Sequence, residues 1–546
     1  MSDATTEGTG LFLNGTDRPR GYLEARGFRS WALTLDHKRI GLLYLYTTLL
    51  FFLVGGVFAL LMRIKLMYPG QQIFSDHTYN VLFTLHGSVM IFLFIIPAIP
   101  SGMGNFFIPL LIGARDVAFP KLNLMSYWIF VAGILILLAS LVRPMDTGWT
   151  FYTPYSAKTS ADVTLLSFGI FLIGMSSILT GLNFLVTIHK LRAPGMGWHR
   201  LPLFIWGMYA TSIIQVVATP VVGITFLLLA MERLFGIGFF DPAKGGDPLL
   251  FQHFFWFYSH PVVYVMILPA MGIISEIVPV FSRKPIFGYN AIAYSSLAIA
   301  FIGFFVWGHH MFVSGMSRTA NIIFSFLTFF VAVPTAVKVF NWIATMYKGS
   351  ITFESPMLYA LTFIFLFTFG GLTGMFLGAL ATNVHVHDTY FIVAHFHYTM
   401  MGGTVMGFLA GMHYWWPKMT GRMLNEKLAK SAWLLIFIGF NVTFLTQFFL
   451  GYHGMPRRWA EYPPQFQGLN IVSTVGSWIL ALGILAMFVN FIRGLYAGEP
   501  APPNPWKGLT LEWRTESPPP TENFETIPVV TDWPYGYVKR KTEGDE

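Results

Sequence analysis

The chain has 546 residues, of which 54% are hydrophobic and only 11% are charged, and its mean hydropathy is +0.58. This composition excludes a soluble globular protein and indicates a membrane protein built from segments of about 20 apolar residues. The sequence contains no cysteine. It therefore excludes cysteine-attached haem, iron–sulfur clusters and thiolate copper sites within this chain. The net charge of +8 comes from basic residues spread over loops, which indicates membrane topology and not nucleic-acid binding.

Twelve apolar runs follow the polar, basic residues 1–38, in which we expect no cleavable signal peptide. They predict an all-α integral membrane protein, a bundle of twelve transmembrane helices. After Gly498 the sequence becomes polar and proline-rich, which predicts an extended tail outside the bilayer. We therefore expect an N-terminal segment at 1–38, a membrane domain at 39–497 and a tail at 498–546. The apolar runs are 40–64, 79–112, 123–143, 163–189, 203–230, 251–280, 287–314, 322–346, 357–380, 390–416, 432–451 and 471–496.

The basic residues predict the orientation of this bundle. Loops on the side of the N-terminus carry more lysine and arginine than loops on the other side, so both ends of the chain are expected inside. The pair Arg457–Arg458 lies in an outer loop and goes against this bias.

Six histidines fall in apolar runs close to the expected outer surface. Ionisable groups at membrane depth are costly, and imidazole is the common neutral ligand for iron and copper, so this layer predicts a metal or haem site. His395 and His397 are two residues apart and point roughly 200° apart on a helix, so they serve two different centres. The six are His86, His260, His309, His310, His395 and His397.

Four short motifs contain these histidines, in the order Thr84–Gly87, Trp256–Tyr264, Trp307–His310 and His387–Tyr398. Together they resemble subunit I of the haem–copper oxygen reductases, specifically the cytochrome c oxidases, over nearly the whole chain. The resemblance implies the catalytic subunit of a terminal respiratory oxidase in a bacterial inner membrane. Such an enzyme reduces O2 to water with four electrons and translocates protons.

The resemblance also implies the ligand sets. His86 and His397 are the expected axial ligands of a low-spin haem, and His395 is the expected single ligand of a high-spin haem. His260, His309 and His310 are the expected ligands of the active-site copper, copper B. Tyr264 is i+4 from His260 and so lies on the same helix face; in the family this tyrosine is cross-linked to the histidine and can supply an electron and a proton.

Outer-loop residues complete the expected cofactor sites. Arg63 matches an arginine that contacts the formyl group of the low-spin haem, which suggests haem A in both haem sites. Trp149, Arg457 and Arg458 match residues on the propionate side. His387 and Asp388 resemble ligands of a magnesium ion above the haems. The implied partners are a subunit II that carries a dicopper centre, subunit III and small subunits, cytochrome c or a fused cytochrome c domain, membrane lipids and a respiratory supercomplex, with no nucleic acid.

Two inner routes for protons are implied. Lys338 resembles the lysine of the family's K pathway, with Thr335 and Ser275 beside it, and a buried lysine shifts its pKa readily. Asp116 resembles the entrance of the D pathway. The polar lining expected for the second route consists of Tyr44, Asn105, Asn123, Ser176, Ser177 and Asn183.

The sequence departs from the usual family pattern at Val262, where most mitochondrial-type members have a proton-relaying glutamate. Tyr258 is i−4 to Val262 and, with Ser259, forms a Tyr-Ser-His-Pro variant similar to that of a bacterial subgroup. Our hypothesis is that these two hydroxyls complete the relay. A second departure is Lys65, which stands where many members have a calcium-binding glutamate.

Other functions remain as alternatives. A quinol oxidase of the same fold has histidine and glutamine at positions matching Thr78 and Val81, so its quinone site is not expected here. A nitric oxide reductase is disfavoured because Tyr264 and Lys338 belong to the oxygen-reducing pattern. A twelve-helix solute transporter would explain the hydropathy but not the six histidines.

Overall fold

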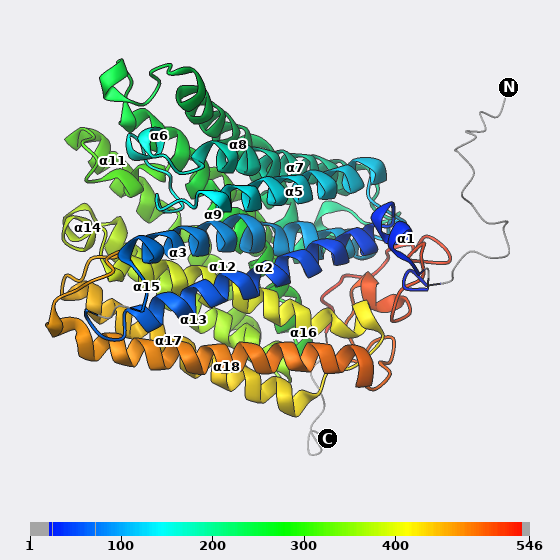
Figure 1. Ribbon diagram of the computed structural model, residues 1–546. Coiled ribbons are helices and arrows are strands. Elements are labelled where there is room, and N and C mark those ends of the chain that lie inside the picture. Colours follow the sequence, from blue (N-terminus) through cyan, green and yellow to red (C-terminus); the bar gives the residue numbers. More distant parts are fainter. Residues whose placement is uncertain (1–20, 25, 71–72, 538–546) are drawn as a thin grey trace, which may run out of the picture.

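The structure is a computed structural model that describes residues 21–24, 26–70 and 73–537. Within these ranges the regular elements are helices, and β-structure is limited to three isolated bridges. The long helices lie side by side in one bundle (Figure 1), so the predicted all-helical class is confirmed. Ten helices of the described chain are long and apolar enough to cross a membrane.

These ten spans coincide with ten of the predicted runs. Asp36, Ser75, Asp247, Ser317 and Asn425 cap N-termini, because each side chain accepts a hydrogen bond from a backbone N–H of the first turn. The spans are α2 (His37–Lys65), α3 (Asp76–Ser88) continuing through two π-helical stretches into α4 (Asn105–Ile112), α5 (Pro120–Ala139), α7 (Val163–Lys190), α8 (Leu203–Phe235), α9 (Pro248–Ser282), α11 (Arg318–Phe330) with α12 (Ala332–Met346), α13 (Ser355–Gly378), α17 (Glu426–Tyr452) and α18 (Gln467–Ala497).

The run predicted at 287–314 is not one continuous helix. Its α-helix, α10 (Tyr289–Gly303), ends early, and His309 and His310 lie in a separate 3₁₀ turn, Trp307–Met311. The prediction that these histidines sit near the end of a long helix is therefore wrong. The apolar composition continues past the break, so hydropathy cannot locate it. The helix ends at Gly303, whose backbone is so close to the ring of Tyr264 that a Cβ atom would lie 2.6 Å from it.

The run predicted at 390–416 is helical throughout but changes type in the middle. A π-helical stretch, Met400–Val405, separates α15 (Tyr390–Thr399) from α16 (Met406–Thr420). Two glycines occupy this stretch, and a Cβ atom on Gly402 or Gly403 would lie within 3 Å of Leu366 or Ile267. Close helix packing thus accompanies the irregular turn. The remaining short helices are α1 (Phe28–Ala32), α6 (Tyr155–Lys158) and α14 (Leu380–Val386).

Helix α9 forms the centre of the bundle. It packs against α8, α10, α12, α13 and α16, and nearly all of its residues are buried. In contrast, α11 and α12 expose large apolar side chains such as Phe326, Phe330 and Phe340, which suits contact with lipid. The element that carries His260 and Tyr264 is therefore held on all sides by other helices.

The C-terminal tail packs along one end of the bundle, where Figure 1 shows it in red beside α1. At the opposite end lie α6, α11 and α14. The tail is mostly irregular, and Leu511, Trp513 and Tyr535 are buried. The Tyr535 hydroxyl donates to Glu276 of α9 at 2.7 Å and accepts from the backbone N–H of Leu203 at 2.6 Å. We call residues 498–537 the tail strap.

Candidate metal centre

Three histidines converge from α9 and the 3₁₀ turn. His260, His309 and His310 each offer a ring nitrogen, and these nitrogens lie within 4.8 Å of one another. The ring centroids of His260 and His309 are 4.5 Å apart, and those of His309 and His310 are 4.4 Å apart. Trp256 stacks on His310 at 3.8 Å and fixes its plane. Three neutral imidazoles facing one point suit copper or zinc, and in the described chain no other such metal-ligand cluster occurs.

Hydrogen bonds determine which nitrogen of each ring is free for a metal. His260 Nε2 lies 2.8 Å from the Tyr264 hydroxyl, and His309 Nδ1 lies 2.9 Å from Thr328 Oγ1. His260 Nδ1 and His310 Nε2 face each other at 3.2 Å. These two nitrogens point toward each other, so the donor set fits a three-histidine metal site with Tyr264 against one ligand.

A second pair of histidines faces across a gap between helices. His86 of α3 and His397 of α15 have nearly parallel rings, with an interplanar angle of 13° and centroids 6.4 Å apart. A metal held by both rings at bonds of about 2 Å would separate their centres by roughly 6 Å. Each Nδ1 donates at 2.8 Å to a backbone carbonyl, that of Gly55 or Val393, which leaves both Nε2 atoms free.

The space around this pair can hold a large planar group. A cavity of about 380 Å³ is lined by both histidines and by Phe444, Arg63, Trp149, Arg457 and Arg458. Arg63 is buried, and its Nη2 donates to the carbonyl of Asn470 at 2.9 Å. Its Nε and Nη1 have no hydrogen-bond partner among the described residues. Two orphaned donors beside the cavity fit an acceptor on the bound group, because an unsatisfied buried donor is costly.

Two arginines close the cavity at the end opposite the tail strap. Arg458 packs on Gly148, where a Cβ atom would lie 2.9 Å from the guanidinium, and burial together with Arg457 lowers the pKa of Arg458 to about 10. Trp149 reaches the same region because Gly87 leaves room for it. Asp388 pairs with Arg457, and the neighbouring buried guanidinium of Arg458 fits a carboxylate on a bound group.

His395 points to the other side of α15. Its Nδ1 lies 3.0 Å from the carbonyl oxygen of Gly370 and 3.2 Å from Thr373 Oγ1, both on α13, so Nε2 is free. His397 instead stacks on Phe444 of α17 at 4.2 Å. The two rings thus face different neighbouring helices, α13 and α17.

His387 and Asp388 lie together between α14 and α15. His387 Nε2 is 3.6 Å from Asp388 Oδ2, and Asp388 Oδ1 accepts from Arg457 Nη2 at 2.7 Å. Burial alone would raise the pKa of Asp388, but Arg457 and His387 outweigh it and lower this pKa. Two protein ligands fit Mg²⁺, which usually keeps several waters.

Lys65, the second departure from the family pattern, forms an ion-pair cluster. Its Nζ lies 2.9 Å from Glu461 Oε1 and 3.4 Å from Asp76 Oδ1, and Glu461 Oε2 also accepts from the N–H of Gly70. The ammonium therefore joins these carboxylates directly.

Lys338 and Ser275 lie in the core between α9, α10 and α12. The Lys338 ammonium is buried and donates to Ser296 Oγ at 2.7 Å. Ser275 Oγ accepts from Trp342 Nε1 at 3.0 Å, whereas Thr335 Oγ1 bonds its own helix at Val331. The structure thus places Lys338 beside a serine that the sequence motifs do not indicate.

Polar side chains form a ladder from Asp116 into the bundle. Asn183 Oδ1 accepts a hydrogen bond from the backbone N–H of Phe119 at 3.0 Å, close to the loop of Asp116. Further in, the hydroxyl oxygens of Tyr44 and Ser176 are 3.0 Å apart. The amide of Asn123 and the Oδ1 of Asn105 have no hydrogen-bond partner among the described residues although both side chains are buried. Unpartnered buried polar atoms such as these fit contacts with ordered water.

The ladder continues through residues that sequence reasoning missed. Gln215 of α8 donates from Nε2 to Ser177 Oγ at 3.1 Å, and Thr180 Oγ1 lies 3.4 Å from Ser126 Oγ. Gln215 Oε1 is buried and unpartnered in the described chain. A glutamine in the middle of an apolar run was a signal available in the sequence.

Tyr258 and Ser259 are both buried at the level of the histidine cluster. Ser259 Oγ has no hydrogen-bond partner in the described part of the chain. Val262 is buried and apolar, so its side chain offers no protonatable group, whereas Tyr258 and Ser259 each place a hydroxyl about one turn or less before it.

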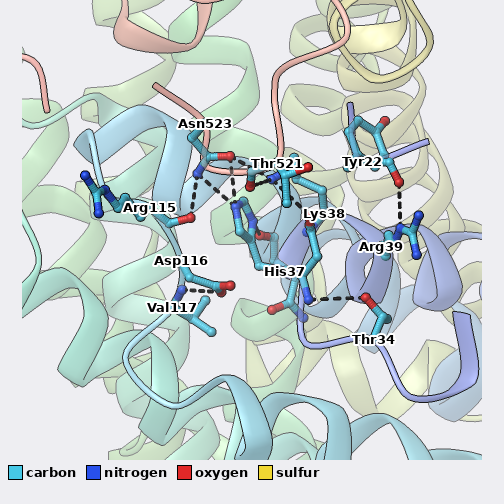
Figure 2. Close-up of polar contacts among 12 residues, drawn as sticks. Tyr22, Thr34, His37, Lys38, Arg39, Arg115, Asp116, Val117, Thr521 and Asn523 are labelled. Carbon is cyan, nitrogen blue, oxygen red and sulfur yellow. Dashed lines mark hydrogen bonds and ion pairs between the residues drawn. The ribbon is translucent and has the colours of Figure 1, made fainter. Parts of the chain in front are cut away.

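The loop of Asp116 meets the start of α2 and the tail strap (Figure 2). Asp116 Oδ1 accepts from the N–H of Val117 at 2.6 Å. Burial raises the pKa of Asp116 to about 7, an effect that the N–H of Val117 and the Lys38 ammonium oppose. A carboxyl group with this pKa exchanges protons near neutral pH.

Comparison with known proteins places these features in a family. The family described as Cytochrome C and Quinol oxidase polypeptide I matches residues 39–479. Cytochrome c oxidase subunit 1 of Thermostichus vulcanus is 48% identical over 519 residues, covering 94% of both chains. The Synechocystis sp. protein of the same name is 47% identical and covers 92% of both, and that of Bacillus subtilis is 44% identical, covering 92% of this chain and 82% of the relative.

A solved structure, described as a cryo-EM structure of a heme-copper terminal oxidase dimer, has the same fold. Its TM-score is 0.74 with 21% sequence identity, over 85% of each chain. At this identity the likeness concerns the fold alone.

Proposed function

Because this chain belongs to the cytochrome c and quinol oxidase polypeptide I family, and is the catalytic subunit of a terminal oxidase, we propose which of its residues carry the reaction. The proposed reaction is the four-electron reduction of O2 to water, with electrons from cytochrome c through a dicopper centre on subunit II, coupled to proton translocation. The observation that carries the proposal is the three-histidine cluster with the Tyr264 hydroxyl 2.8 Å from His260.

His260, His309 and His310 are proposed to hold copper B, and His395 to hold a high-spin haem with one open position. When bound, these metals supply the electrons and the site for dioxygen reduction. Tyr264 holds a proton on its hydroxyl beside His260, and this proton is the one delivered to the reacting oxygen. Trp256 stacks on the ring of His310 and would orient this ligand.

His86 and His397 are proposed to hold a low-spin haem in the 380 Å³ cavity. Haem A is proposed because the free donors of Arg63 would bind its formyl oxygen. Trp149, Arg457 and Arg458 would bind the propionates. His387 and Asp388 would hold Mg²⁺ above the haems, where Arg457 links this site to the propionate side.

Two proton routes start at the end of the bundle that carries the tail strap. Lys338, with Ser296, Thr335 and Ser275, is proposed to carry protons to Tyr264. Asp116 is proposed to collect protons for the polar ladder, which ends at Tyr258 and Ser259 in place of a carboxylate at Val262. The unpartnered oxygen atoms of Asn105, Gln215 and Ser259 support a water-filled path, because each requires a partner.

The membrane arrangement is proposed from the charge bias. The chain crosses a bacterial inner membrane twelve times, with residues 1–38 and the tail strap inside and the arginine pair outside. The ten long spans, together with α10 and the continuous α15–α16 stretch, provide these crossings. The proposed partners are subunits II and III and small subunits.

The test is an optical and respiratory one on the purified enzyme. A reduced-minus-oxidised spectrum is expected to show the far-red band of haem A, and oxygen uptake is expected with reduced cytochrome c and not with quinol. A spectrum without any haem band would contradict the oxidase proposal. Uptake with quinol alone would instead indicate a quinol oxidase, although Val81 is apolar and buried where a quinone ligand is expected.

A further inference from the structure

Asn523 of the tail strap contacts both the loop of Asp116 and the start of α2. The amide of Asn523 is fully buried, and its Nδ2 donates at 2.8 Å to the carbonyl of Ala114 and lies 3.2 Å from the carbonyl of Arg115. These are the two peptide groups just before Asp116. Figure 2 shows Asn523 between this loop and the first turn of α2.

The same amide binds the start of α2. His37 Nδ1 lies 2.7 Å from the carbonyl of Asn105, so it is the donor nitrogen, and Nε2 is the acceptor for Asn523 Nδ2 at 2.9 Å. Asn523 Oδ1 accepts from the Lys38 ammonium at 2.9 Å, and this ammonium also donates to the carbonyl of Thr521 at 2.8 Å. Every polar atom of the Asn523 side chain thus has a partner outside the tail strap.

The backbone at this position suits asparagine. Asn523 has φ of +66°, in the left-handed region that asparagine tolerates better than most residues. Its N–H donates to the carbonyl of Pro520, and its carbonyl accepts from Thr515 Oγ1 at 2.7 Å, so the turn is held within the strap. The strap therefore presents this amide in a fixed orientation.

We propose that Asn523 is a positioning residue for Asp116, and that its amide holds the loop of Asp116 against the start of α2 so that the tail strap forms one wall of the proton entrance. The proposal rests on the proposed role of Asp116 as that entrance. Proton uptake would then depend on a residue about 400 positions away in the chain.

The charged groups around Asp116 give the expected direction of the effect. Asp36, His37 and Lys38 face it from the start of α2, Arg115 lies in its own loop and Glu522 lies in the strap, 3.8 Å from Arg115. Burial is the main cause of the raised pKa of Asp116, which is about 7. Release of the strap admits water, so this pKa falls toward its ordinary value.

The experiment is the pH dependence of proton uptake by the whole enzyme carrying Asn523→Gly. Glycine tolerates the positive φ, so the variant removes the amide without backbone strain. The pH midpoint of uptake is expected to move down by about one unit, which lowers uptake at pH 8 by about ten-fold. The haem spectrum is expected to stay unchanged. Asn523→Asp keeps the acceptor for Lys38 but loses the donors, and it is expected to shift the midpoint in the same direction by less.

Asn504→Gly is the matched control. Asn504 is in the same strap, but within the described residues its side-chain amide bonds only Gly508, so this variant is expected to keep the wild-type profile. The inference is overturned if an Asn523 variant that assembles keeps the wild-type pH profile of proton uptake. Asp116→Asn separates the role of Asp116 from that of Asn523. If Asp116→Asn leaves proton uptake unchanged, the proposed entrance itself is wrong. If Asp116→Asn slows uptake but Asn523→Gly keeps the wild-type pH profile, only the role of Asn523 is overturned.

Discussion

The buried ammonium of Lys338 is held by one serine hydroxyl, Ser296 Oγ at 2.7 Å, within an apolar core. A lysine in such surroundings costs stability, so a functional role explains its presence better than a structural one.

Replacement of Lys338 by methionine should separate function from stability. We expect Lys338→Met to lower turnover by about 100-fold, because protons no longer reach Tyr264 by this route. Assembly should be at least as efficient, since an apolar side chain replaces a buried charge. Oxygen uptake measures the turnover, and the haem spectrum measures the assembly. Lys427→Met, at an exposed lysine, is the control, and full turnover in Lys338→Met would contradict the proposed route.

The hydroxyl of Tyr258 is the subject of a second prediction. Tyr258→Phe should slow turnover or pumping by at least about ten-fold, because the proposed relay then loses one of its two hydroxyls. Proton uptake and pumping by the enzyme in vesicles measure the effect. Tyr359→Phe is the control and is expected to keep wild-type pumping. The Tyr359 hydroxyl is buried and has no partner in the described chain, but it lies on α13 and is not part of the proposed relay. Wild-type pumping in Tyr258→Phe would exclude the relay hypothesis.

Individual residues differ in how far the sequence predicts them. The histidines could be predicted because each lies in a short motif and its spacing fixes the helix face. The hydrogen bonds that select their free nitrogens could not, because Gly55, Gly370 and Thr328 belong to other helices and have no local pattern. Asn523 was beyond prediction for the same reason, since its partners are 408 to 486 positions away.

At the scale of elements, the tail strap is held to the bundle by buried polar groups as well as by aromatic packing. Glu512 is a buried residue of the strap, and its Oε1 accepts from Thr510 Oγ1 at 2.8 Å and from Trp415 Nε1, on the bundle, at 3.3 Å. Burial raises the pKa of Glu512 to about 7, although these donors and Lys418 oppose the shift.

The docking of the strap is therefore expected to depend on pH. A carboxyl whose pKa is raised on docking contributes its full stabilisation below the ordinary value of about 4.5, and this contribution is lost as pH rises through about 7. The loss is about 1.4 kcal/mol per pH unit across that window. Proteolysis of the strap should thus become faster between pH 5 and 7, and Glu512→Gln should remove this dependence.

Glu516→Gln tests whether the effect belongs to the buried group. Glu516 is exposed on the same strap, so its variant is expected to keep the wild-type pH dependence. An unchanged pH slope in Glu512→Gln would show that another group controls docking.

The elements themselves were largely predictable, because a stretch of about 20 apolar residues in lipid must be helical. Hydropathy failed where helices change type without a change of composition. Gly303 at the end of α10, and Gly402 and Gly403 in the π-helical stretch after α15, lie in close contact with other helices, and a single run of residues does not contain that information.

For the whole molecule, the orientation in the membrane gives a direct prediction. The chain has no cysteine, so a single introduced thiol can be labelled without background from this chain. Lys121→Cys should react with an impermeant reagent only from the inside, and Lys244→Cys only from the outside. Both positions are exposed in the structure. Labelling of both variants from one side would contradict the proposed crossings.

The two proposed metal-binding regions are completed at different times during synthesis. The three-histidine cluster comes from α9 and the following 3₁₀ turn, so its ligand set exists once residue 310 has been made. The cavity between His86 and His397 is walled by α2 at one end of the chain and by Ala481, Ile484 and Leu485 of α18 at the other. Synthesis of the chain is thus nearly complete before the cavity between His86 and His397 can close. Until α18 has been made, this cavity stays open on one side to a large planar group.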